Sequence, residues 1–314
     1  MLTRRHIRVK VLQSIYAYNQ SENKNLEKQE KFLLYNMEQM QDLYLVTLQL
    51  FIALRDQADN FLSISQKKHL ATDLEKNPSR VFVENKVIDL IATNEAFSDI
   101  INRKKLNYWE DDSEYVTILF NSLKEKDWYT DFLKQKTTNF FEDKDFLIKV
   151  FKEVIAPNEK LYEYIEDKRL TWVDDFPLVN TLLVKMLSKI SEKNVNAILI
   201  PDLYKNKEDR DYAIDLMQKV IIEDEELTKI IDEKTPNWDK ERIADLDMII
   251  LKMGISEFLY FPSIPIRATI NEYLEVSKEY STPKSSLFIN GILDKLVKEF
   301  SKSEKINKSG RGLK

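Results

Sequence analysis

Residues 237–300 read NWDKERIADLDMIILKMGISEFLYFPSIPIRATINEYLEVSKEYSTPKSSLFINGILDKLVKEF. Apolar residues recur in this stretch every three to four positions, which is the spacing of an α-helix with a buried face. The first predicted helix runs from Asp239 to Tyr260, and its apolar residues form a stripe wider than that of a surface helix: Ile243, Leu246, Ile249, Ile250, Leu251, Met253, Ile255 and Phe258. We therefore expect this helix to lie at the centre of its domain.

Two prolines divide the rest of the stretch into two further helices. Pro262 ends the first helix, and Pro265 begins the second at a first-turn position, where its missing N–H has no helical partner to lose. The buried residues predicted for the second and third helices are Ile266, Ile270, Tyr273 or Leu274, Ser277, Phe288, Ile292, Leu296 and Phe300. Gly254 is expected where another backbone approaches closely, and Asn290-Gly291 is expected to be helix-internal and tightly packed.

The composition of the chain indicates an all-α globular protein. Its 314 residues include 4 Gly, 8 Pro, 43% hydrophobic and 32% charged residues. This length fits two domains, or one domain with a large insertion. No apolar run reaches the roughly 18 residues that a membrane span needs, and the basic amino terminus lacks the apolar core of a signal peptide. We therefore expect no membrane association and a cytoplasmic location.

Residue types that carry most enzyme chemistry are rare or absent. The chain has no cysteine, which excludes disulfides, thiolate nucleophiles and sulfur-ligated metals, and His6 and His69 are far apart. It has neither a Gly-rich phosphate loop nor a Gly-x-Ser-x-Gly nucleophile motif. Carboxylate pairs such as Asp111 and Asp112 are explained most simply as solvated helix faces. The sequence predicts no enzymatic activity, no cofactor and no metal.

Positive charge is concentrated at the two ends of the chain. Residues 1–21 carry a formal charge of +4 with no acidic residue, and residues 301–314 carry five bases against Glu304. Because the total is −5, the remaining residues carry −13. Two basic ends on an acidic body indicate a local contact with a polyanion. The segment 301–314 is polar and contains glycine, so we expect a basic flexible tail that can add phosphate contacts.

The amino-terminal basic residues lie at the start of a predicted helix. Thr3 is a suitable N-cap, and Ile7, Val11 and Ile15 are spaced for burial. Arg4, Arg5, Arg8 and Lys10 follow the cap, although cations near a helix amino terminus oppose the helix dipole by a few tenths of a kcal/mol each. A solvated helix end would explain them without function. Phosphate is the ligand that would favour them, because guanidinium binds it in a bidentate manner and also stacks on unpaired bases.

In order and spacing, these residues and those of the 237–300 stretch resemble the NusB family of bacterial transcription antitermination factors. The resemblance rests on the basic start with Val11-Leu12-Gln13-Ser14-Ile15-Tyr16, and then on Trp238, Arg242-Ile243, Asp247, Ile250-Leu251-Lys252, Glu257, Pro265, Ile270-Asn271-Glu272, Ser277-Lys278 and Phe288-Ile289-Asn290-Gly291-Ile292-Leu293-Asp294. It covers about residues 1–20 and 208–300, a little over a third of the chain.

The resemblance implies an RNA-binding antitermination factor. Such a factor pairs with the small-subunit ribosomal protein NusE, binds boxA-type single-stranded RNA in ribosomal RNA transcripts, and joins the antitermination complex of RNA polymerase. The residues implied for RNA binding are Arg4, Arg5, His6, Arg8, Lys10, Lys252 and Lys284, with His6 at a position where arginine is common. Tyr16 and Asp247 are implied for partner binding. A half-buried helix aromatic would explain Tyr16 equally well, and a buried cap or ion pair would explain Asp247.

Between the two matching parts lies a long segment that the family does not share. We divide the chain into a basic first helix (1–20), a helical insertion packed on the NusB-like module (21–207), the NusB-like carboxy-terminal half (208–300) and the tail (301–314). A bundle core is the simplest explanation of the apolar stripe that marks the helical segment 33–62: Leu33, Met37, Met40, Tyr44, Leu48, Phe51 and Leu54.

The insertion contains a candidate internal repeat. Residues 143–172 and 206–238 align at an offset of 66 from Asp145 and Asp211 onward, and each segment ends in a Trp that precedes an apolar helix. A weaker third copy runs from Glu84 to Trp109. Duplication and coincidence both stay open, because helices of equal period match by chance at several positions. If duplication is real, the insertion is built from repeated helix pairs.

Two other function classes are compatible with parts of this pattern. A NusB-type module also precedes the catalytic domain of some ribosomal RNA cytosine methyltransferases, but that chemistry needs a cysteine nucleophile and a nucleotide-cofactor fold, and the chain has neither. The stronger alternative is a non-enzymatic helical scaffold for protein partners in transcription or ribosome assembly, which would use the insertion. Such a scaffold would bind its partners without any role for the basic ends.

Overall fold

The computed structural model describes residues 1–69, 72–235 and 244–313. The chain forms two compact units, of which unit 1 comprises residues 1–37 and 203–314 and unit 2 comprises residues 38–202. The regular elements of the described residues are helices, with no strand among them, which confirms the all-α prediction.

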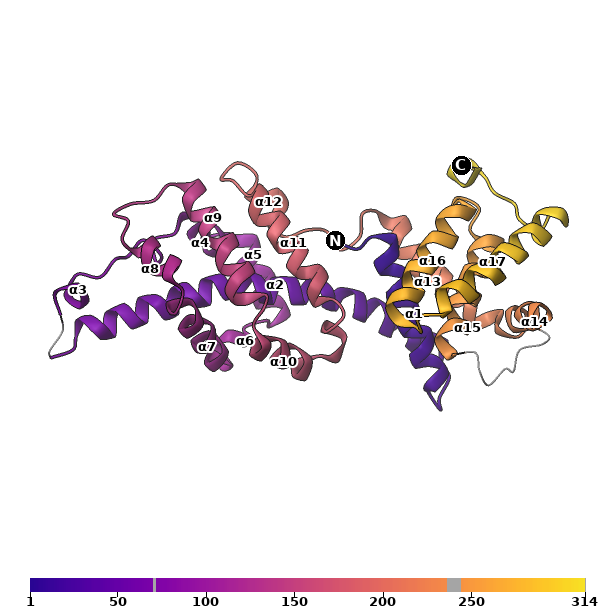
Figure 1. Ribbon diagram of the computed structural model, residues 1–314, viewed down its shortest axis with the longest axis horizontal. Coiled ribbons are helices and arrows are strands. Elements are labelled where there is room, and N and C mark those ends of the chain that lie inside the picture. The colour runs from indigo at the N-terminus through magenta and orange to yellow at the C-terminus, as the bar shows by residue number, and fades with distance from the viewer. Residues whose placement is uncertain (70–71, 236–243, 314) are drawn as a thin grey trace. The chain divides into compact units, whose positions relative to one another are not determined.

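Unit 1 is organised around the helix that the sequence places at its centre. It contains α1 (Arg4–Gln20), the start of α2 (Leu26–Gln66), α13 (Lys207–Ile222), α14 (Asp224–Lys234), α15 (Asp245–Tyr260), α16 (Ile266–Tyr280), α17 (Ser285–Lys302) and the 3-10 turn η4 (Gly310–Leu313). Helix α15 packs against α1, α13, α14, α16 and α17. Helix α1 thus lies beside helices that follow it by about 200 residues in the chain (Figure 1).

Burial along α15 confirms its central position. Every residue from Ile249 to Phe258 is buried, including Lys252, Ser256 and Glu257. The part of the predicted helix from Asp239 to residue 243 lies outside the described residues. The two buried charged side chains, Lys252 and Glu257, require partners inside the unit, because an unpaired buried charge is costly.

The face that α16 buries agrees in part with the prediction, because Tyr273 and Ser277 are buried as predicted. Pro265 is the N-cap of α16 rather than a first-turn residue, and Thr269 and Tyr273 are fully buried, whereas Ile266 and Ile270 are half-buried. The buried row therefore includes the hydroxyl-bearing residues Thr269, Tyr273 and Ser277. The hydroxyl groups of Thr269 and Tyr273 donate to Glu257 of α15 and so provide hydrogen-bond partners for a buried carboxylate.

The two helical glycines have different surroundings from those predicted. A Cβ on Gly254 would lie 3.1 Å from Leu293 Cδ2, so the close neighbour is a side chain and not a backbone. Gly291 lies inside α17, as predicted, but a Cβ there would meet nothing within 4 Å. The prediction of tight packing at Gly291 is therefore wrong. On α17, Ile292, Leu296 and Phe300 are buried as predicted, and Phe288 is half-buried.

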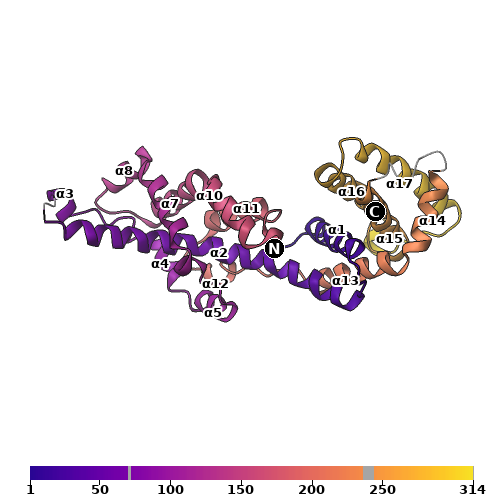
Figure 2. The same ribbon diagram turned by 90° about the horizontal axis from the view of Figure 1, so that it is seen from below.

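Unit 2 is built on the larger part of α2. Its other elements are α3 (Asp73–Lys76), α4 (Lys86–Ala92), α5 (Glu95–Lys104), α6 (Tyr108–Asp111), α7 (Ser113–Lys124), α8 (Asp127–Leu133), α9 (Phe140–Val150), the π-helical turn η1 (Phe151–Ile155), α10 (Glu159–Lys168), η2 (Leu170–Trp172), α11 (Phe176–Lys189) and α12 (Val195–Ile198). Residues 42–48 of α2 are all buried, so neighbours surround this helix, and Figure 2 shows them on both sides of it. The predicted stripe from Leu33 to Leu54 is confirmed as core.

Helices recur in the same order around two of the tryptophans that end the predicted repeats. Helix α5 precedes Trp109 and α7 follows it, as α10 precedes Trp172 and α11 follows it. Both indole Nε1 groups donate to carbonyl oxygens of α2 at 2.8 Å, Trp109 to Val46 and Trp172 to Gln39, about two helical turns apart. Trp238 lies outside the described residues. A common origin of the segments stays a prediction.

Candidate nucleic-acid interface

The basic residues at the start of α1 line a surface groove of unit 1. Thr3 caps the helix as predicted, and its Oγ1 accepts the backbone N–H of His6. His6 closes the capping box, because its Nδ1 accepts the backbone N–H of Thr3 at 3.2 Å. The groove, of about 720 Å³, is lined by Thr3, Arg4, Arg5, His6, Arg8, Ser263, Ile264, Pro265, Ala268, Glu272 and Arg311. The lining thus holds four arginines and one carboxylate.

Arg4 and Arg5 are partly exposed and are each held by a carboxylate. Arg4 Nε lies 3.0 Å from Asp209 Oδ1, and the guanidinium lies 4.7 Å from the ring centroid of Tyr212. Arg5 makes a bidentate pair with Glu272 at 2.9 and 3.0 Å. Their side chains are 32% and 43% exposed, so both guanidinium groups stay reachable for an anion while the carboxylates orient them.

Arg8 is placed differently, beneath the groove. Its side chain is 3% exposed and makes a bidentate ion pair with Glu257 at 2.7 and 2.9 Å. Glu257 is completely buried and also accepts hydrogen bonds from the hydroxyls of Tyr212, Thr269 and Tyr273. Burial alone would raise the pKa of Glu257, but Arg8 and the hydrogen bonds outweigh it and lower that pKa. The carboxylate therefore stays ionised and ties α1 to α13, α15 and α16.

His6 contributes no positive charge at neutral pH. Burial, and then the neighbouring charges of Arg5 and Lys10, lower the pKa of His6 to about 4. The neutral ring agrees with its geometry, because Nδ1 can accept the N–H of Thr3 only when that nitrogen carries no proton.

The remaining predicted site residues lie elsewhere in unit 1. Tyr16 is 40% exposed on α1, and Lys284, the N-cap of α17, is exposed. Lys10 is buried, and Lys252 is 8% exposed with its Nζ 2.6 Å from Asp224 Oδ1 of α14. The groove therefore brings together Arg4, Arg5, His6 and Arg8 but not Lys10, Lys252 or Lys284.

Asp247 fastens the loop before α17. It lies in the first turn of α15, is 6% exposed, and accepts hydrogen bonds from Ser281 Oγ at 2.6 Å and Ser285 Oγ at 2.7 Å. An acidic side chain in a first helical turn is favoured by the dipole, and here it also holds the chain reversal between α16 and α17. These contacts give Asp247 a structural role within unit 1, and its part in partner binding stays a prediction.

Sequence reasoning did not assign three residues that shape the groove. Glu272 pairs with Arg5, Arg311 reaches the lining from the tail, and Lys308 Nζ donates to the carbonyl oxygens of Glu257 and Phe261 at 2.8 and 3.0 Å. The tail therefore lies against unit 1 in this structure. Contacts between residues so distant in the chain leave no local signal in the sequence.

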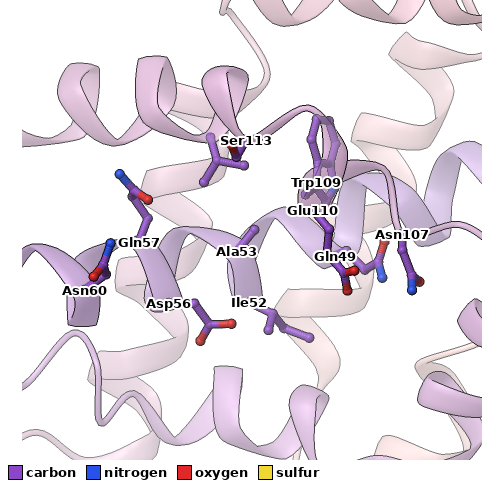
Figure 3. Close-up of a pocket in the computed structure, with 11 residues that line it drawn as sticks. Gln49, Ile52, Ala53, Asp56, Gln57, Asn60, Asn107, Trp109, Glu110 and Ser113 are labelled. Atoms are coloured by element: carbon purple, nitrogen blue, oxygen red, sulfur yellow. The ribbon is translucent and has the colours of Figure 1, made fainter.

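A second groove, in unit 2, has a different chemical character. It has a volume of about 340 Å³ and is lined by Gln49, Ile52, Ala53, Asp56, Gln57, Asn60, Asn107, Trp109, Glu110, Ser113 and Val116. Figure 3 shows the side chains that α2 contributes facing those of the α6 and α7 segment. The lining includes carboxylates and amides but no cation, which does not suit phosphate.

No group of three or more His, Cys, Asp or Glu side chains within residues 1–69, 72–235 and 244–313 is arranged to hold a metal ion. None of the helices in those ranges has both the length and the apolar character of a membrane-spanning segment.

Comparison with known proteins finds relatives of the carboxy-terminal part of the chain. The model of the NusB family matches residues 179–298. The transcription antitermination protein NusB of Salinibacter ruber is 33% identical over 123 residues, which are 39% of this chain and 77% of that protein. The proteins of the same name from Chloroherpeton thalassium and Koribacter versatilis are 34% and 38% identical over 122 and 99 residues. These cover 39% and 32% of this chain, and 58% and 68% of the relatives. No solved structure gives a significant match.

Proposed function

The chain belongs to the NusB family of transcription antitermination proteins, and on that premise we propose that it binds single-stranded RNA through the groove at the start of α1. The observation that best supports this proposal is the gathering of Arg4, Arg5, His6 and Arg8 in one groove of unit 1. In the proposed complex the exposed guanidinium groups of Arg4 and Arg5 bind backbone phosphates. The carboxylates behind them hold the two groups in place before RNA arrives, which lowers the entropy lost on binding.

The other predicted site residues have different roles in this proposal. Arg8, Lys10, Asp247 and Lys252 are buried, so we assign them to holding the helices that carry the surface rather than to contact with RNA. Tyr16 and Lys284 are exposed, and we assign them to the partner surface and to a further RNA contact respectively. His6 would contribute a hydrogen bond or a stacking surface rather than charge, because its pKa is about 4.

Family membership supports a proposal for the partner and for the RNA sequence. We propose that the chain pairs with the ribosomal protein NusE, that the pair binds boxA-type RNA in ribosomal RNA transcripts, and that both enter the antitermination complex of RNA polymerase. The role needs no catalytic activity and no cofactor, and it places the protein in the cytoplasm with the transcription machinery.

Fluorescence anisotropy with a boxA-like strand and a scrambled strand tests this function. Each strand is titrated with the full chain, with and without the cognate NusE protein. The expected result is tighter binding to the boxA-like strand, with a preference that grows when NusE is present. Equal affinity for both strands under every condition would exclude boxA recognition.

The groove of unit 2 favours a second candidate function, a scaffold for protein partners. Its carboxylates Asp56 and Glu110, its amides and the indole of Trp109 suit a polar peptide segment with a basic side chain better than a nucleic acid. Copurification of the full chain with polymerase or ribosomal particles, compared with the Asp56→Asn, Glu110→Gln variant, tests this candidate. Loss of a partner in the variant with unchanged RNA affinity would support the scaffold.

A further inference from the structure

The carboxy-terminal tail, residues 303–313, turns back from α17 toward the start of the groove. The chain reverses after Lys302, where Glu304 adopts a left-handed conformation with φ 54° and the N–H of Lys305 bonds to the carbonyl of Phe300. The N–H of Ser309 then bonds to the carbonyl of Pro262 at 3.0 Å, in the loop between α15 and α16. The tail lies beyond residue 298, where the family match ends.

Two specific contacts hold the tail against that loop. Lys308 Nζ donates to two carbonyls at the carboxyl end of α15, where a cation also complements the helix dipole. Gly312 is buried, and a Cβ there would lie 1.9 Å from the backbone oxygen of Pro262, so no other residue fits without a shift. A half-buried lysine that donates to two carbonyls and a contact that only glycine fits indicate a defined docking site for this otherwise polar segment.

The docked tail carries Arg311 into the groove lining. Its side chain is 77% exposed, and the carboxylate beside it, that of Glu208, is 70% exposed and lies 3.7 Å from Arg311 Nη2. An exposed pair at this distance contributes little, about 0–1 kcal/mol. Arg311 is therefore the least engaged guanidinium in the lining.

The charge balance of the groove depends on this residue. The three arginines from α1 are matched by three carboxylates, because Arg4 pairs with Asp209, Arg5 with Glu272 and Arg8 with Glu257. A neutral set of pairs attracts a polyanion weakly. The pair of Arg311 with Glu208 is long and exposed. An incoming phosphate can therefore replace Glu208 as the partner of Arg311 at a small cost in free energy.

We propose that the docked tail is the second wall of the RNA-binding groove and that Arg311 binds a backbone phosphate there. This inference rests on the proposed RNA-binding function and extends it to a segment outside the family match. The RNA strand would then lie between Arg4 and Arg5 on one side and Arg311 on the other.

Two variants separate docking of the tail from its charge. Arg311→Gln removes the charge and leaves the docking contacts, whereas Gly312→Ala keeps every charge and displaces the tail through its contact with Pro262. Gly291→Ala is the matched glycine control, since a Cβ there meets nothing within 4 Å, and Lys302→Gln removes a charge outside the groove lining. Each full-length variant is titrated with boxA-like RNA in the presence of NusE at several salt concentrations. Amide hydrogen exchange of residues 303–313 reports docking.

Arg311→Gln is expected to weaken binding about tenfold at low salt and to make the slope of log affinity against log salt shallower by about 0.7. Gly312→Ala should speed exchange in the tail and weaken binding to a similar degree, while both controls bind like the wild type.

If wild-type RNA binding is measurable and Arg311→Gln leaves it unchanged, the tail proposal is wrong and the proposed function stands. Tighter binding by Gly312→Ala would also overturn it, since the tail would then obstruct the groove. Absence of RNA binding by the wild type would overturn both.

Discussion

At the scale of single residues, Arg8 shows why position in the basic run does not determine role. Arg4 and Arg8 lie one helical turn apart, yet Arg4 is 32% exposed and Arg8 is 3% exposed with its charge committed to Glu257. Removing one member of a buried ion pair leaves the other uncompensated, which costs far more than loss of a surface pair. A substitution of Arg8 therefore affects folding before it affects RNA.

Arg8→Met is expected to lower the free energy of unfolding by about 3–5 kcal/mol. In this variant burial is no longer opposed by Arg8, so the pKa of Glu257 should rise above its unfolded value. The folded state would then bind the extra proton, and the deficit relative to the wild type should shrink as pH falls from 7.5 to 5. Urea denaturation of both proteins at the two pH values measures this deficit. Arg5→Gln, at the partly exposed pair with Glu272, is the control, with an expected change below about 1 kcal/mol. An Arg8→Met protein as stable as that control would contradict the assignment.

His6 provides a test of pH dependence. Because its pKa falls to about 4 on folding from an ordinary value near 6.5, the folded state binds fewer protons between these values. The contribution of His6 to stability should be complete above pH 6.5 and should be lost as pH falls toward 4. His6→Gln keeps a side-chain acceptor at the capping-box position and cannot titrate. It should match the wild type at pH 7 and exceed it in stability at pH 5, as measured by chemical denaturation. Identical pH profiles would argue against a half-buried His6 that stays neutral down to pH 5.

At the scale of elements, the glycines of α15 and α17 distinguish packing from helix propensity. Gly291→Ala adds a methyl group in open space inside a helix and should stabilise the protein by about 0.5–1 kcal/mol. Gly254→Ala brings the same gain in helix propensity, but its Cβ would lie 3.1 Å from Leu293 Cδ2. This variant should therefore stabilise the protein less than Gly291→Ala, or destabilise it. Thermal or urea unfolding of both variants measures the difference. Equal stabilisation by the two would mean that Leu293 does not restrict the site.

The same elements show what the sequence could predict. The breadth of the apolar pattern of α15 identified it as a central helix, and the spacing from Leu33 to Leu54 identified the core face of α2, because both signals are local. The inward face of α16 was predicted only in part: Tyr273 and Ser277 are buried as predicted, but Thr269, which donates to Glu257 on another helix, was not among the predicted residues. A polar network in the core buries residues that apolar spacing does not identify, and its members can be assigned only once the packing of the helices is known.

At the scale of the whole molecule, the candidate site combines the two ends of the chain. The sequence located the basic segment of α1 and a basic tail, but it did not predict that Lys308 and Gly312 dock the tail on the loop after α15 or that Arg311 enters the groove. These contacts join residues that are far apart in sequence, so composition indicates only a mobile tail. The resemblance of residues 237–300 to one family, by contrast, depends on order and spacing alone and is confirmed by the family match and the relatives.

The most direct test of the central claim, that the groove at the start of α1 binds RNA, is the salt dependence of RNA affinity for the wild type and the Arg4→Gln, Arg5→Gln variant. Stability is measured in parallel, because Asp209 loses its partner. If the two guanidinium groups neutralise two phosphates of a single strand, the slope of log affinity against log salt should become shallower by about 1.4 in the variant. An unchanged slope in a stably folded variant would mean that RNA, if bound at all, binds elsewhere.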